Sequence, residues 1–105
     1  GPVDAAIKAV QKLTSPLVNV NLKEYRIEAA TGGSDAMGEV IIKVEDKDGN
    51  VVSSRAVNED IVMASVEAMI DSINKSLLKS RLLIVLTVLF LFERIYIIFN
   101  FKNII

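Results

Sequence analysis

The chain has 105 residues, with 12 basic and 13 acidic side chains and a formal net charge of −1. A chain of this length forms one domain or part of one, and its balanced charge argues against a nucleic-acid-binding surface. It contains no cysteine and no histidine, which excludes disulfides, thiolate metal sites and the usual general base.

The first predicted element is a helix over residues 3–13. Apolar residues recur there every three or four positions, which is the period of an amphipathic helix. Pro2 suits the first helical position because its missing N–H would have no helical partner there. The helix is expected to end before Pro16, because a proline disfavours helical geometry in the preceding residue, Ser15.

The next predicted element is a half-buried strand over residues 23–31. Tyr25, Ile27 and Ala29 alternate there with charged residues, so one face of the strand is expected to pack inward. Residues 17–22 are interpreted as a connection with some strand character.

A glycine-rich loop over residues 31–40 leads to a second strand. The loop holds Gly32, Gly33 and Gly38, and glycine is favoured where the backbone turns tightly. A hairpin connection and an anion-binding cradle would both use such glycines. No Gly-Lys-Ser/Thr sequence follows and a strand comes next, so a hairpin is the better interpretation.

Two further strands are predicted over residues 39–45 and 51–57. In the first of them, β-branched residues alternate with charged residues. An Asp-Gly pair in residues 46–50 is the signal of a tight hairpin turn between the two strands. The acidic turn does not match the glycine and glutamate positions of an EF-hand, which argues against calcium binding.

A second helix is predicted from about Asp60, with an apolar stripe that continues to Leu77. Asn58 or Asp60 can cap its start by accepting a hydrogen bond from a backbone N–H. The predicted fold class is therefore α+β: a helix followed by a β-β-β-α unit, in which helices cover an antiparallel three-stranded sheet.

The character of the chain changes after residue 80. Residues 82–92 and 95–105 are almost entirely apolar, and the pair Glu93-Arg94 separates them. Three interpretations of residues 81–105 stay open: a membrane anchor, a buried structural element, and AT-rich DNA translated past or out of the true frame. We therefore divide the chain into a domain of residues 1–80 and an atypical hydrophobic tail of residues 81–105.

Three sequence motifs occur in order along residues 1–80. They are Gly1-Pro2-Val3-Asp4-Ala5, the decapeptide T-G-G-S-D-A-M-G-E-V of residues 31–40, and Asp60-Ile61-Val62-Met63-Ala64-Ser65. Together they resemble the C-terminal regulatory domain shared by 2-isopropylmalate synthase and (R)-citramalate synthase. The resemblance extends to about residue 78, and the tail has no counterpart in that family.

The resemblance implies half of a pseudo-twofold (βββα)2 regulatory domain: the last helix of one unit and the complete second unit. It also implies a homodimer that binds the end product of a pathway, leucine or isoleucine. The parent enzymes are acyltransferases that condense acetyl-CoA with a 2-oxo acid. Their divalent metal, acetyl-CoA site and catalytic residues belong to a separate catalytic barrel, so we expect no catalytic residue, metal or cofactor in this chain.

The alternative function is a purely structural dimerisation module, which the tail would tether to a membrane. Under either function the lack of cysteine fits a reducing cytoplasm, where we expect the protein to work. The sequence leaves open which of the two amino acids would be the effector.

Candidate effector-binding residues lie mainly at the two helix starts, where backbone N–H groups attract a carboxylate. Asp35 or Asp60 is a candidate partner for the effector's ammonium group, and Tyr25 or Ile61 for its aliphatic side chain. A helix cap is the competing interpretation of Asp60, and sheet packing is that of Tyr25. The complete set of candidates is Gly1, Pro2, Val3, Tyr25, Asp35, Asp60, Ile61 and Ala64.

Overall fold

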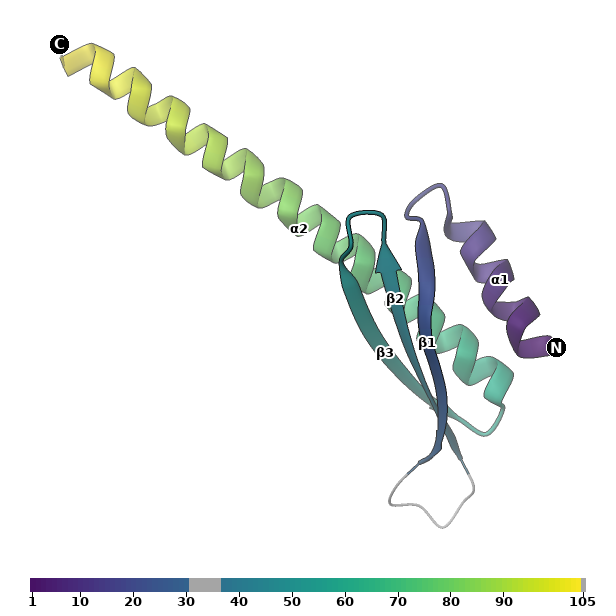
Figure 1. Cartoon of the computed structure of the whole chain (residues 1–105). Helices are drawn as coiled ribbons and strands as arrows, with labels where there is room; N and C mark the ends of the chain where they lie inside the picture. Colours follow the sequence, from purple (N-terminus) through teal and green to yellow (C-terminus); the bar gives the residue numbers. More distant parts are fainter. Residues whose placement is uncertain (31–36, 105) are drawn as a thin grey trace.

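A computed structural model describes residues 1–30 and 37–104 as a helix, three strands and a second, much longer helix (Figure 1). The strands form one antiparallel sheet in the order β1-β2-β3. This architecture confirms the predicted α+β class and the β-β-β-α unit. The elements are α1 (Pro2–Thr14), β1 (Val20–Ala29), β2 (Gly38–Asp46), β3 (Val51–Asn58) and α2 (Ile61–Ile104).

The core lies between the inner face of the sheet and the first part of α2. The central strand β2 contributes three fully buried residues on its inner face, which confirms the predicted inward set. On α2, small residues alternate with larger ones, so that the helix approaches the sheet closely and its longer side chains fill the remaining space. The buried residues are Val40, Ile42 and Val44 on β2, and Ala64, Ala68, Met69 and Ile73 on α2.

The end of α1 is where it was predicted, but for a different physical reason. Ser15 keeps helical dihedral angles of −56° and −32°, so the expected departure from helical geometry at this residue was wrong. Pro16 has no N–H to donate to the Lys12 carbonyl, and the Ser15 hydroxyl donates to that carbonyl instead, at 2.9 Å. The chain then turns, with the Leu17 N–H bonded to the Thr14 carbonyl at 2.9 Å.

Strand β1 begins at Val20, three residues before the predicted start. The pairing of β1 with β2 is interrupted by a bulge between Leu22 and Glu24, and a bulge inserts one extra residue into the alternation. Leu22 pairs with Val44 on the inner face. The insertion of Lys23 therefore concealed the first part of the strand in the sequence.

The inner face of β1 is only partly covered. Tyr25 is half-buried, as predicted, but Ile27 is 54% exposed and Ala29 is exposed as well. The expectation that all three residues pack inward was therefore wrong for two of them. Ile27 lies opposite the fully buried Val40, so its exposure reflects missing cover rather than a shift of register.

The outer face of the sheet carries charged residues around one buried isoleucine. Ile41 is only 3% exposed although it lies between Arg26 and Arg55 on the neighbouring strands. Arginine side chains bury their apolar stems along such a surface while the charged ends stay in water. Ion pairs hold these ends, from Arg26 to Glu24 at 2.8 Å and from Arg55 to Glu39 at 3.1 Å.

Helix α2 continues without a break through residue 80 and extends far beyond the sheet (Figure 1). Among the described residues, the aliphatic and phenylalanine side chains from Leu82 to Phe101 are all at least 50% exposed. No described residue covers this part of the chain, and the three interpretations of residues 81–105 stay predictions. The domain boundary at residue 80 stays a prediction.

The turn between β2 and β3 is held by the carboxylate of Asp46. Its Oδ1 accepts hydrogen bonds from the backbone N–H groups of Asp48 and Asn50, both at 2.9 Å, and its Oδ2 accepts one from Asn50 Nδ2 at 3.2 Å. Gly49 has a φ of +83°, the conformation that glycine adopts at the end of a three-residue hairpin loop. Desolvation raises the pKa of Asp46, but these hydrogen bonds outweigh it, so the pKa lies below its ordinary value.

We predict that Asp46→Ala lowers the free energy of unfolding by about 1 kcal/mol at neutral pH, because three acceptor contacts are lost. A lowered pKa contributes stability above the unfolded-state pKa, and this contribution disappears as the pH falls through the folded-state value. The difference between wild type and variant should therefore shrink below about pH 4. Urea unfolding of wild type and variant at several pH values measures this difference in free energy. Asp48→Ala is the matched control, and an equal loss in both variants would contradict this role of Asp46.

Candidate functional site

A cavity of about 490 Å³ lies between the start of α1 and the middle of β1. Its volume is within the range of small-molecule sites, about 300–1,000 Å³. Four of the candidate residues meet there, since the first three residues of the chain and Tyr25 all contribute to its wall. The lining residues are Gly1, Pro2, Val3, Asp4, Ile7, Leu22 and Tyr25.

The start of α1 supplies the polar side of this cavity. The first helical hydrogen bond runs from the Ala5 N–H to the Gly1 carbonyl, at 3.1 Å. The N–H groups of Val3 and Asp4 precede that bond and so have no acceptor within the helix. Together with the positive end of the helix dipole, these two donors favour an anionic group at the cavity.

Gly1 occupies the N-cap position of α1 and makes no side-chain cap. A Cβ added to Gly1 would have no other atom within 4 Å. The described residues therefore leave the space beside Gly1 unfilled.

Asp4 brings a negative charge to the same cavity. Its carboxylate pairs with Lys8 one turn along α1, at 2.9 Å. The hydrogen bond from Lys8 and its positive charge lower the pKa of Asp4, so this carboxylate is ionised at neutral pH. Asp4 was not among the candidate residues, although it belongs to the first sequence motif.

The opposite wall of the cavity is apolar. Ile7 is 4% exposed and anchors α1 in the core, whereas Leu22 is 38% exposed. Neither was a candidate, because Ile7 looked like an ordinary member of the helical stripe and Leu22 lay in the presumed connection. The apolar residues Val20 and Leu22 alternate with the polar Asn21, and this alternation predicts the start of the strand if a bulge is assumed at Lys23.

Tyr25 joins this cavity to α2 through its hydroxyl group. The Tyr25 hydroxyl lies 2.7 Å from Ser65 Oγ, and Ser65 Oγ donates to the Ile61 carbonyl at 2.7 Å. A serine hydroxyl has one proton, so Tyr25 is the donor in the first bond. The result is a chain of hydrogen bonds from the cavity wall to the first turn of α2.

The predicted residues at the start of α2 do not line the cavity. Asp60 caps the helix, since its Oδ1 accepts hydrogen bonds from the N–H groups of Val62 at 2.9 Å and Met63 at 3.4 Å. Ile61 is half-buried and its side chain meets Gly38, where any added Cβ would collide with it. Ala64 is fully buried in the core. Asp35 lies outside the described residues.

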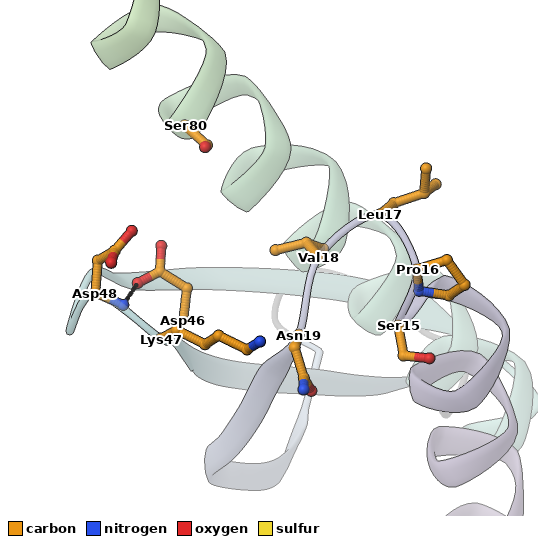
Figure 2. A pocket seen from close by; sticks show the side chains of 9 residues that line it. All are labelled: Ser15, Pro16, Leu17, Val18, Asn19, Asp46, Lys47, Asp48 and Ser80. Carbon is orange, nitrogen blue, oxygen red and sulfur yellow. Dashed lines mark hydrogen bonds between the residues drawn. The ribbon is translucent and has the colours of Figure 1, made fainter.

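A second cavity, of about 250 Å³, lies at the other end of the sheet. It is bordered by the α1–β1 connection, the β2–β3 turn and Ser80 of α2 (Figure 2). Figure 2 shows the Lys47 side chain extending from the turn toward Asn19. None of the predicted effector-binding residues borders this cavity. The Asp46 carboxylate on its wall already accepts hydrogen bonds within the β2–β3 turn. The cavity at the start of α1 is therefore the better candidate for a ligand site.

Comparison with known proteins identifies one matching family model and several related synthases. The family model described as "LeuA allosteric (dimerisation) domain" matches residues 1–77. The 2-isopropylmalate synthase of Methanocaldococcus jannaschii is 54% identical over 79 residues, which make up 75% of this chain and 15% of that protein.

Two further relatives carry provisional names. A protein of Methanopyrus kandleri, named provisionally as 2-isopropylmalate synthase, is 53% identical over 76 residues, or 71% of this chain and 15% of the relative. A protein of Methanoculleus marisnigri, named provisionally as (R)-citramalate synthase CimA, is 49% identical over 77 residues, with coverages of 73% and 15%. These matches confirm the resemblance predicted from the three motifs. The chain spans about 15% of the length of these relatives.

We predict that Ser65→Ala destabilises the protein more than Tyr25→Phe. Ser65→Ala leaves the half-buried Tyr25 hydroxyl without its acceptor, which should lower the free energy of unfolding by about 1–3 kcal/mol. Tyr25→Phe removes one hydrogen bond, which should lower it by about 0.5–1.5 kcal/mol. The double variant should show coupling between the two residues. Urea unfolding of the four proteins measures these differences.

Ser72→Ala is the matched control for Ser65→Ala. Both serines are fully buried on α2, but Ser72 Oγ has no hydrogen-bond partner among the described residues. Its replacement should therefore be nearly neutral or stabilising. Equal losses for the two serine variants would contradict the role assigned to Ser65.

Proposed function

The chain belongs to the family of LeuA allosteric (dimerisation) domains, and we propose that it binds a branched-chain amino acid, leucine or isoleucine, as a feedback effector. The effector would inhibit acyl transfer from acetyl-CoA to a 2-oxo acid in a parent 2-isopropylmalate or citramalate synthase. The observation that carries this proposal is the cavity at the start of α1, which combines a helix start with an apolar wall.

The three parts of an amino acid correspond to three parts of this cavity. The effector's carboxylate accepts hydrogen bonds from the N–H groups at the start of α1, where the helix dipole also favours it. Its aliphatic side chain lies against Ile7, Leu22 and Tyr25. Its ammonium group faces the ionised carboxylate of Asp4, because the Asp60 carboxylate already caps α2. A role for Asp35 stays a prediction.

Occupation of the cavity is transmitted through Tyr25. A ligand that packs on the tyrosine ring favours one position of its hydroxyl and hence of Ser65 and the first turn of α2. Ile61 in that turn packs against Gly38 at the start of β2. The proposed signal therefore passes from the cavity to the N-terminal end of β2. An effector acts by binding one of two such arrangements more tightly.

The parent enzyme's metal and acetyl-CoA are assigned to its catalytic barrel. The described residues of this chain contain no group of three or more acidic, histidine or cysteine side chains that would hold a metal ion. We propose a regulatory role for this domain because the matching family model describes an allosteric domain. We infer that the domain works in the cytoplasm, because the related synthases are biosynthetic enzymes.

A second proposal is that the domain dimerises, with or without an effector. Several large apolar side chains of the domain are uncovered, and Ile27, Met63 and Ile70 are each between 46% and 54% exposed. A second copy would cover such residues, as the family description suggests. Dimerisation alone, without effector binding, is the competing function, and ligand titration separates the two.

We predict that Gly1→Asp weakens the binding of leucine and isoleucine by about 10- to 100-fold, which corresponds to about 1.5–3 kcal/mol. The new carboxylate would occupy the ligand's space and repel its carboxylate. The domain itself should stay folded, because a Cβ added to Gly1 meets no other atom within 4 Å and aspartate is a favourable N-cap. Calorimetric titration measures the affinity, and thermal unfolding confirms that the variant is folded.

Ala9→Asp is the control for charge, since it adds the same carboxylate to an exposed position of α1 outside the cavity. It should leave the affinity within about twofold of wild type. Unchanged affinity in Gly1→Asp would show that the ligand binds elsewhere. Absence of binding in the wild-type chain, with a dimer retained, would favour the structural module instead.

A further inference from the structure

The tail of α2 is the largest apolar surface among the described residues. Apart from Thr87, Tyr96, Asn100 and the pair Glu93-Arg94, every residue from Leu82 to Phe101 is aliphatic or phenylalanine. An 18-residue window of this helix has a mean hydropathy of 2.4, and none of it is buried. The described part of the chain offers this surface no cover, because the sheet ends where the tail begins (Figure 1).

The distribution of these side chains around the helix indicates what covers them. Leu82, Leu83, Ile84, Val85 and Leu86 are consecutive and each is 50–61% exposed. Consecutive residues point in different directions around a helix, so the tail is apolar on all sides. A helix in a groove, or in a two-stranded coiled coil, buries one stripe only. A lipid bilayer is the environment that surrounds a single helix completely.

The length and the ends of the tail fit the same environment. About 20 helical residues span about 30 Å, the thickness of the hydrocarbon layer. Lys79 and Arg81 precede the apolar segment and Lys102 follows it, so basic side chains lie where lipid headgroups would be. We propose that residues 82–101 cross a lipid bilayer and tether the domain to its cytoplasmic face.

Glu93 and Arg94 are the costly feature of this segment, because they would lie near the middle of the bilayer. Their charges cancel, and the Arg94 guanidinium already lies 4.8 Å from the centre of the Phe90 ring. Such a contact partly replaces water around the cation. The mainly apolar sequence on both sides of the pair favours insertion in spite of the cost of the two charges.

The charges also determine the orientation. Lys75, Lys79 and Arg81 lie on the domain side of the segment, against Lys102 on the other side among the described residues. Basic residues are retained on the cytoplasmic side of a membrane. The domain therefore faces the cytoplasm, in agreement with its proposed place of work. This inference is independent of the effector site.

The first experiment is synthesis of the full chain in a cell-free extract with sealed vesicles of phosphatidylcholine and phosphatidylglycerol. After an alkaline carbonate wash, flotation in a density gradient separates inserted protein from soluble or aggregated protein. Wild type should float with the vesicles. The double variant Leu86→Lys, Leu89→Lys should float about tenfold less, because it places two further charges in the apolar layer.

A matched control keeps the same number of added charges away from the tail. Leu13 and Leu17 are 80% and 69% exposed on the domain, so Leu13→Lys with Leu17→Lys should float like wild type. Wild type that stays in the dense fraction as an oligomer would overturn the proposal, because copies of the chain would then cover the tail. Equal flotation of the Leu86, Leu89 variant would overturn it too.

The second experiment uses the absence of cysteine from the sequence. Single variants Ser80→Cys, Leu89→Cys and Asn103→Cys are treated with a maleimide that does not cross membranes. Ser80→Cys should react in intact vesicles, Leu89→Cys only after detergent is added, and Asn103→Cys only after the vesicles are permeabilised. Reaction of Leu89→Cys or Asn103→Cys in intact vesicles would show that the segment does not cross the bilayer.

Discussion

The hydrogen bond between Tyr25 and Ser65 is the contact on which the proposed site depends. It fixes a side chain from the edge strand β1 to the helix that supplies half of the core. Because Ser65 is fully buried and itself bonded to the Ile61 carbonyl, the tyrosine ring has little freedom to move independently of α2. The wall of the cavity and the first turn of α2 are therefore one mechanical unit, as an allosteric domain requires.

Helix α2 has two different environments along its length. Up to Leu77 it is a core helix, and its small side chains allow close packing on β2. From Leu82 on, the same helix carries apolar residues on every side, and no described residue covers them. The family match ends at residue 77 as well. The two parts therefore have different physical requirements, one satisfied by the sheet and the other by a surrounding apolar medium.

Much of the domain could be predicted from the sequence, because its elements follow local rules. The alternation around Ile42, the Asp-Gly turn and the cap at Asp60 each depend on neighbouring residues. The first part of β1 could not be recognised because the bulge at Lys23 breaks the alternation. The exposure of Ile27 could not be predicted, because the alternation places it on the inner face and only the fold shows that no described residue covers it. In the site, the first motif indicated Gly1 and the strand alternation indicated Tyr25, but only the fold brings Ile7 and Leu22 beside them.

The most direct test of the effector site is the measurement of proton–proton contacts between isotope-labelled leucine or isoleucine and the full chain by nuclear magnetic resonance. Binding at the start of α1 should give nuclear Overhauser effects from the effector's methyl groups to the ring of Tyr25 and to the methyl groups of Ile7 and Leu22. Contacts at saturating amino acid that involve only the β2–β3 turn, or none of these three residues, would contradict it.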